Sequence, residues 1–100
     1  MPATIATLGN VVRINLAGEF DFSSQDELKQ MFDKALSASA QTIQINMQNT
    51  VFIDSSVIRL ILKLHDAAGK NKKSLSINNC NARIYEILTI GGFDQVFDIQ

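Results

Sequence analysis

The sequence has very few of the residues that carry redox, metal or nucleophilic chemistry. Among its 100 residues there is one cysteine, Cys80, and one histidine, His65. A single cysteine cannot form an internal disulfide, and the two residues together fall short of the ligand set of a structural zinc site. We therefore expect no disulfide, no metal site and no cofactor, and we expect Cys80 to be a small buried apolar residue.

Long apolar runs are missing as well. No stretch approaches the ~18 to 20 residues of a membrane-spanning helix, and residues 1–4 lack the charged and apolar regions of a signal peptide. The only proline is Pro2, and no linker or low-complexity tract divides the chain. These absences predict a cytoplasmic protein without a membrane partner, folded as one domain over residues 1–100.

An excess of charge of one sign is also absent. Nine basic and ten acidic residues give a formal net charge of −1, which provides no field to attract DNA or RNA. The one local basic cluster is Lys70, Lys72 and Lys73, and its position suits the end of a helix, where cations complement the dipole. We expect no nucleic-acid partner.

Catalytic motifs are not found. The glycines have none of the spacings of phosphate-binding loops, and on one helix His65 would lie roughly 13 Å of axial rise from Ser56, too far for a Ser-His pair. The sequence therefore predicts no catalytic residue. Glu19, Asp21 and Asp54 leave one alternative, since acids at strand ends could meet at a sheet edge and bind Mg²⁺. Capping or turn formation is the other interpretation of Asp21 and Asp54.

What the chain does contain is alternating strand and helix periodicity. The four residues Ser24-Gln25-Asp26-Glu27 are typical of a capping box, in which Ser24 and Glu27 satisfy each other's backbone donors. In order, the pattern predicts a hairpin of residues 4–8 and 11–17, a helix from Ser24 to about residue 37, a strand at 42–47, a helix from about Val57 to Gly69, a strand at 74–78, a helix from Asn81 to Gly91-Gly92, and a strand or docking segment at 93–99.

Strands that alternate with helices indicate βαβ units and parallel pairing. The fold class is therefore α/β, with a mostly parallel mixed sheet of four to five strands and about three to four helices. A hydrophobic content of 46% suffices for one core. Between two of these elements, Val51-Phe52-Ile53 ends in Asp54-Ser55-Ser56, where the serines either cap the next helix or are modified.

The segment Asn46-Met47-Gln48-Asn49-Thr50-Val51-Phe52-Ile53-Asp54-Ser55-Ser56 resembles the core motif of STAS domains, the sulphate-transporter and anti-sigma-factor-antagonist family. Gly18-Glu19-Phe20-Asp21-Phe22 is similar to the family's motif after its second strand, and residues 84–93 resemble its closing helix and turn. The chain departs from the family pattern at Val57, where glycine is common, and at Asn46, where aspartate is common.

The resemblance implies a non-enzymatic bacterial switch that takes part in partner switching, transcription regulation and stress response signalling. A serine kinase that is also an anti-sigma factor would phosphorylate the second serine, here Ser56, and a serine phosphatase would reverse this. Asp54, Ser55 and Asp21 would surround the phosphorylation site. The alternatives are a constitutive STAS subunit of a transporter or other complex, without phosphorylation, and an enzyme or small-molecule sensor that uses the acidic edge.

A partner surface is predicted from the helix that follows Ser56. Ile58 and Leu62 lie off its main apolar stripe, with Arg59 and Lys63 alongside, so that these four residues are the candidate partner-binding set. Packing of Ile58 and Leu62 beneath a neighbouring loop is the alternative.

Overall fold

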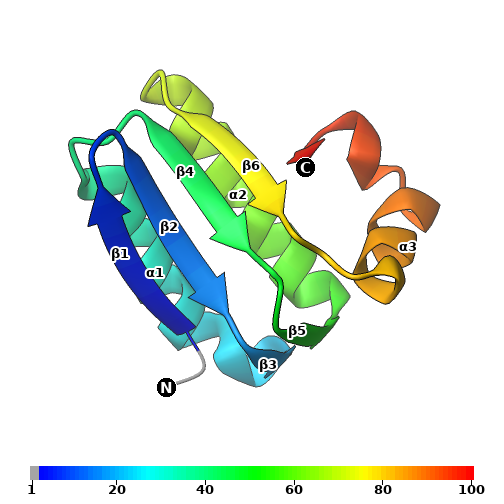
Figure 1. The fold of residues 1–100 in the computed structure, drawn as a ribbon. Coiled ribbons are helices and arrows are strands. Elements are labelled where there is room, and N and C mark those ends of the chain that lie inside the picture. The colour runs from blue at the N-terminus through cyan, green and yellow to red at the C-terminus, as the bar shows by residue number, and fades with distance from the viewer. Residues whose placement is uncertain (1–2) are drawn as a thin grey trace.

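A computed structural model of the chain describes residues 3–100, so that the predictions touching Met1 and Pro2 lie outside the described residues. This part of the chain begins with a β-hairpin, and strands and helices alternate after it (Figure 1). The elements are β1 (Ala3–Leu8), β2 (Val11–Leu16), β3 (Gly18–Phe20), η1 (Phe22–Ser24), α1 (Gln25–Ser37), β4 (Thr42–Asn46), β5 (Thr50–Ile53), α2 (Ser55–Lys70), β6 (Ser74–Asn78), α3 (Ala82–Ile90), η2 (Phe93–Gln95) and β7 (Asp98–Ile99).

The strands form two sheets. The larger has five strands in the order β1-β2-β4-β6-β7. Its first pair is antiparallel, joined by a tight turn at Gly9 (φ +59°), and the other neighbours are parallel. The predicted α/β class and mostly parallel mixed sheet are confirmed. The second sheet, a parallel pair of β3 and β5, is a feature that the periodicity does not predict.

Helices α1 and α2 cover one face of the larger sheet (Figure 1). The alternation of β4 turns Ile43 and Ile45 toward that side, and both are completely buried. Apolar stripes on the two helices supply the rest of this layer: Leu28, Phe32 and Ala35 from α1, and Val57, Leu60, Ile61, Leu64 and Ala68 from α2. Within residues 3–100, no helix is long and apolar enough to cross a membrane.

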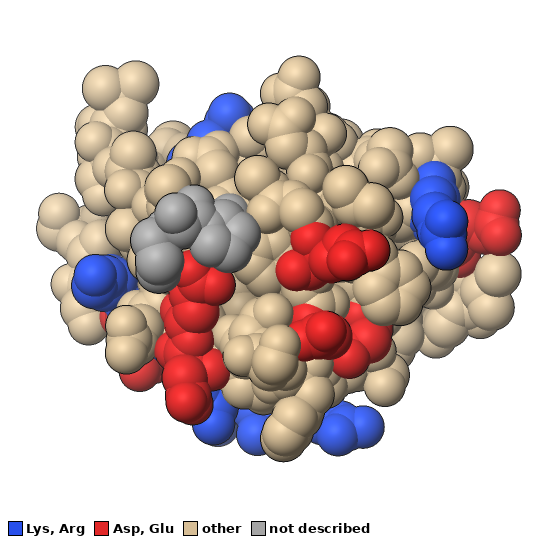
Figure 2. Space-filling model, turned by 90° about the horizontal axis from the view of Figure 1, so that it is seen from below, with Lys and Arg blue, Asp and Glu red and all other residues tan. Residues whose placement is uncertain are grey.

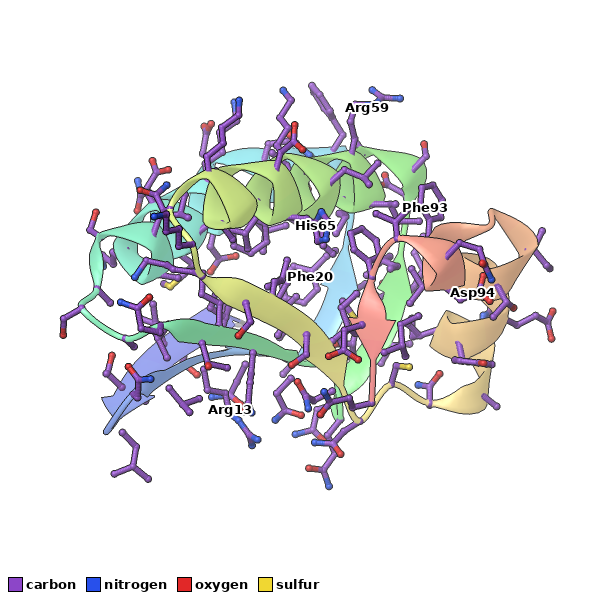
Figure 3. The ribbon with its side chains drawn as sticks, turned by 90° about the horizontal axis from the view of Figure 1, so that it is seen from above. Arg13, Phe20, Arg59, His65, Phe93 and Asp94 are labelled. Atoms are coloured by element: carbon purple, nitrogen blue, oxygen red, sulfur yellow. The ribbon has the colours of Figure 1, made fainter. Side chains whose placement is uncertain are left out.

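The opposite face of the larger sheet is polar. Arg13 points away from the helices there (Figure 3) and donates from Nε and Nη2 to Oε1 of Gln44 at 3.1 and 2.9 Å. Farther along, the Asn46 side chain donates to Asn15 at 2.8 Å and accepts from Asn79 at 2.9 Å. The family departure at Asn46 therefore has a structural role, because an amide both donates and accepts across the strands.

The first helix begins differently from the prediction. Ser24 and Glu27 form no capping box, since α1 has no side-chain cap at Ser24. Instead, Oδ1 of Asp21 accepts the N–H of Ser23 at 2.9 Å, and Oγ of Ser24 accepts the N–H of Asp21 at 3.1 Å. Aspartate and serine are similarly good caps, so that an earlier cap forms and one 3₁₀ turn, η1, precedes α1.

The end of α2 is close to the prediction. The helix passes Gly69, ends at Lys70, and is closed by Asn71, whose side chain donates to a carbonyl one turn back at 2.7 Å. Lys73 does not extend freely into solvent as a cation at a helix end commonly does. Its ammonium group donates to the carbonyl of Ala38 at 2.7 Å. This bond ties the connection after α2 to the connection after α1.

The C-terminal part follows the predicted order. Oδ1 of Asn81 caps α3 by accepting the N–H of Ile84 at 2.9 Å, and the helix ends at Ile90, directly before Gly91 and Gly92, the latter with φ +78°. The segment after it forms η2 and then β7, which pairs in parallel with β6. It lies beside α3 and returns to the sheet, with Phe93 directed toward α2 (Figure 3).

Candidate functional site

The short strands β3 and β5 bring two aspartates to one end of the molecule. They run parallel, with Phe20 opposite Ile53, and the next residues are Asp21 and Asp54. Phe20 is completely buried and Ile53 is 1% exposed, so that the core fixes both strand ends. Carboxyl ends of parallel strands are where α/β sheets commonly carry their sites. The sequence leaves this meeting of strand ends open as one alternative, and the pairing of β3 with β5 places the two aspartates after neighbouring strand ends.

Asp54 is the N-cap of α2. Its backbone is extended (φ −102°, ψ −179°), and Oδ1 accepts the N–H of Val57 at 3.1 Å and the hydroxyl of Ser56 at 2.6 Å. Ser55 and Ser56 lie in the first helical turn, which corrects the interpretation in which a serine caps the helix. Val57 lies within the first turn of α2, and its side chain is completely buried. The turn therefore does not need the conformational freedom of the glycine common in the family.

The hydrogen bonds around Asp54 favour its charged form. The Ser56 hydroxyl lowers the pKa of Asp54 below its ordinary value, and the N–H groups of Val57, Ser56 and Phe22 act in the same direction, whereas burial opposes them. A carboxylate is stabilised by donors that point at it. At neutral pH the turn therefore holds a carboxylate with the serine proton directed at it.

Loss of this cap is expected to destabilise the protein. Asp54→Ala should lower the free energy of unfolding by about 0.5 to 2 kcal/mol, whereas Asp54→Asn keeps a capping oxygen and removes only the charge. Because the folded pKa lies below the unfolded one, the charge stabilises the fold above about pH 4 and its contribution is lost as the pH falls through the folded value. Urea denaturation across this range measures both effects.

The matched control is Asp33→Ala, an exposed acid on α1, which should change stability by less than about 0.5 kcal/mol. A stability difference between wild type and Asp54→Asn that stays constant from neutral pH into the acid range would contradict the assignment.

Ser56 lies at the edge of a small hollow between α2 and the start of α1. Its carbonyl accepts a hydrogen bond from the Gln25 side chain at 3.3 Å. The hollow measures about 130 Å³, and its lining consists of Phe22, Gln25, Ser56, Arg59, Leu60 and Lys63. Arg59 and Lys63 follow Ser56 by about one and two helical turns, and Arg59 points outward from α2 (Figure 3). The structure thus brings the phosphorylation candidate and both predicted cations to one place.

Ile58 and Leu62 lie around a different hollow. It measures about 150 Å³ and also includes Ser55 and Phe93. Ile58 is only 6% exposed, and Leu62 is half-buried. Ile58 is therefore buried rather than exposed, which favours the alternative of packing beneath a neighbouring segment, here the one that carries Phe93. A role for either residue in partner binding stays a prediction.

Figure 2 views the molecule from below and shows acidic side chains gathered in the middle of this end. Several basic side chains lie along the lower rim, the side of α1 and α2, and others lie at the left, right and upper edges of the view. Among the described residues, no three His, Cys, Asp or Glu side chains are close enough to hold a metal ion. Asp21 instead accepts the hydroxyl of Ser23 at 2.5 Å, a second Asp-x-Ser turn beside the first.

Two other sequence candidates lie apart from this site. His65 packs its ring edge against Phe97, with centroids 5.8 Å apart and an angle of 73° between the rings. Cys80 is half-buried, less than expected, and burial raises the pKa of its thiol.

Phe22 and Gln25 are the site residues that sequence reasoning missed. The sequence did contain a sign of Phe22, because it is an aromatic residue outside every predicted apolar stripe. Its side chain is 74% exposed in the structure. Gln25 carries no such signal, because its contact with Ser56 joins residues distant in sequence.

The protein combines a mixed sheet that has helices on one face with a capped Asp-Ser-Ser turn after β5. It is therefore a small α/β domain that places serines at the start of a helix. A family model described as "Mlab, STAS domain" matches residues 3–99. The chain therefore belongs to the STAS domain family. A STAS-domain containing protein of Pseudomonas aeruginosa (strain UCBPP-PA14) is 28% identical over 91 residues, which are 91% of this chain and 89% of the relative.

Solved structures share the fold. An anti-sigma factor antagonist from Mycobacterium paratuberculosis superposes with a TM-score of 0.86 at 15% identity, covering 97% of this chain and 82% of that one. The Bacillus cell fate determinant SpoIIAA in its phosphorylated form gives 0.74 at 19% identity, covering 98% and 90%. The STAS domain of a SulP transporter from Vibrio cholerae gives 0.68 at 17% identity, covering 93% and 75%. The fold is thus common to antagonists and to transporter domains.

Proposed function

We propose that this protein is a non-enzymatic switch of the anti-sigma factor antagonist type, controlled by reversible phosphorylation of Ser56. It binds a serine kinase that is also an anti-sigma factor, and a serine phosphatase restores the unmodified state. The observation that carries this proposal is the place of Ser56: its hydroxyl donates to Asp54 at 2.6 Å, and the residue lines a hollow that two cations also line. Among the solved relatives, SpoIIAA is named an anti-sigma factor antagonist and has a phosphorylated form.

A phosphate on Ser56 is compatible with the fold. It would add about −1.5 to −2 charges in the first turn of α2, where the helix dipole favours anions by roughly 0.3 to 1 kcal/mol. The Asp54 carboxylate opposes the new charge and loses the hydroxyl as a donor. Arg59 and Lys63 line the same hollow and offset that repulsion.

The larger effect of the phosphate is on docking. A charge that becomes buried and unpaired in an interface costs several kcal/mol, and each 1.4 kcal/mol is about a tenfold change in affinity. The switch therefore acts by excluding a partner rather than by refolding the domain. In this proposal the protein acts in the cytoplasm, within a stress-response pathway that regulates transcription, and contacts neither nucleic acid nor membrane.

A phosphorylation assay tests the proposal. The protein is incubated with ATP and its cognate serine kinase of anti-sigma character, and intact-protein mass spectrometry follows the reaction. We expect one phosphate on the wild type, none on Ser56→Ala, and unchanged labelling of the matched control Ser55→Ala. Absence of transfer to the wild type, or equal labelling of Ser56→Ala, contradicts the proposal.

A second candidate is a constitutive STAS subunit of a transporter or other complex, in which the serines contact a partner without being modified. The likeness to the transporter STAS domain of Vibrio cholerae favours it. A transporter operon around the gene would decide for this candidate, whereas a neighbouring kinase gene would decide for the switch.

A further inference from the structure

A groove runs between the outer surfaces of α1 and α2. Its volume is about 270 Å³. The floor is apolar and consists of Phe32, Leu36, Leu60, Leu64 and Ala67, while Lys29, Asp33 and Lys63 form the rim. An apolar floor beneath charged side chains is typical of a surface that takes up apolar groups of a partner.

The groove adjoins the hollow beside Ser56, because Leu60 and Lys63 line both. We call the combined surface the α1–α2 trough. From Ser56 to Ala67 helix α2 rises about 16 Å, or three helical turns. The phosphorylation candidate therefore lies at one end of this combined surface.

The charge of the trough differs in sign from that of the whole protein. Its basic side chains are Lys29, Arg59 and Lys63, and its acidic side chain is Asp33. The formal charge of the chain is −1, so that the trough is a local concentration of positive charge. Carboxylates on a partner complement such a rim, and a basic partner would be repelled.

We propose that the α1–α2 trough binds an acidic amphipathic helix of a partner protein, with apolar side chains on the floor and carboxylates against Lys29, Arg59 and Lys63. Two helices bound the trough, which therefore offers no strand edge for backbone pairing. Its apolar floor runs along α2 from Leu60 to Ala67, about two helical turns, which is the length spanned by anchors at positions i, i+4 and i+7 of a docked helix. The inference rests on the proposed function in one respect: a phosphate on Ser56 would compete with these carboxylates for Arg59 and Lys63.

A titration with designed peptides tests the proposal on the full unphosphorylated chain. The probe is a helical peptide of about 15 residues, with leucines at the three anchor positions and glutamates flanking them, and its partner probe has lysine in place of every glutamate. We expect amide chemical-shift changes confined to the trough, and at least about tenfold weaker binding of the lysine peptide.

Two double variants separate the trough from general charge. Lys29→Glu with Lys63→Glu should weaken the acidic peptide at least about tenfold. Lys34→Glu with Lys70→Glu makes the same charge change on the same helices away from the trough, and should leave its affinity within about twofold. Equal weakening in both would overturn the proposal, as would absence of shifts, equal binding of the two peptides, or shifts that depend on protein concentration without peptide, which would assign the trough to a second copy.

The link to phosphorylation is tested separately. Phosphoserine placed at position 56 during translation should weaken the acidic peptide at least about tenfold, and equal affinity would overturn the competition for Arg59 and Lys63. No kinase takes part in either experiment. Failure here is therefore distinguishable from failure of the kinase assay.

Discussion

Phe20→Ala should lower the free energy of unfolding by about 3 to 5 kcal/mol. The ring is completely buried where β3 ends opposite Ile53, and its removal leaves a cavity at a strand of only three residues. Domains of this size are stable by about 5 to 15 kcal/mol, so that much of the total is lost. Urea denaturation followed by circular dichroism measures the change.

Phe22→Ala is the matched control for this experiment. The same substitution two residues later removes a ring that is 74% exposed, and it should change stability by less than about 0.5 kcal/mol. Similar losses in both variants would contradict the assignment of Phe20 as the residue that anchors β3 beside β5. If Phe20→Ala remains folded, amide signals of Asp21 and Asp54 should shift, because the two turns depend on that pairing.

Phosphoserine at position 56 should weaken binding of the partner at least about a hundredfold, equivalent to about 2.7 kcal/mol. The reason is the desolvation of a doubly charged group in the interface, combined with its competition for nearby cations. The midpoint temperature of thermal unfolding should change by only a few degrees, since the helix start tolerates an anion. Isothermal titration calorimetry with the partner kinase measures the change in affinity, and a thermal melt of the same sample measures the change in midpoint temperature.

Ser55→Asp and Ser56→Asp form the matched pair for this prediction. Both add one carboxylate to the first turn of α2, but Ser55 is exposed and does not line the hollow that contains Ser56. We expect the larger loss of affinity from Ser56→Asp. Unchanged binding of Ser56→Asp and of the phosphoserine protein would favour the constitutive STAS subunit over the switch.

The larger sheet and its helices follow from local periodicity. Ile43 and Ile45 alternate with polar residues on one strand, and the apolar stripes repeat over about two turns of α1 and three turns of α2, so that several residues support each pattern. The β3–β5 pair shows no such repeating pattern in the sequence. Strands of three and four residues are too short to show a period, and their pairing comes from the contact of Phe20 with the core.

The site was predicted in part. Asp54 and Ser56 are only two residues apart in sequence, and their geometry follows from the start of α2. Ile58 is different, because the burial of a residue at the border of an apolar stripe depends on what packs against it. Phe93, which shares a hollow with Ile58, lies far along the chain. The cap at Asp21 rather than Ser24 reflects a choice between two groups of similar strength, which sequence spacing does not resolve.

The partial burial of Cys80 makes the protein straightforward to label for optical work. A thiol whose pKa is raised by burial forms little of the reactive thiolate at neutral pH. Leu8, by contrast, is 86% exposed at the end of β1, by the hairpin turn, and that turn lies at the end of the sheet opposite β5 (Figure 1). A cysteine introduced at position 8 should therefore react with a maleimide dye selectively, and a fluorophore there reports on complex formation without covering Ser56.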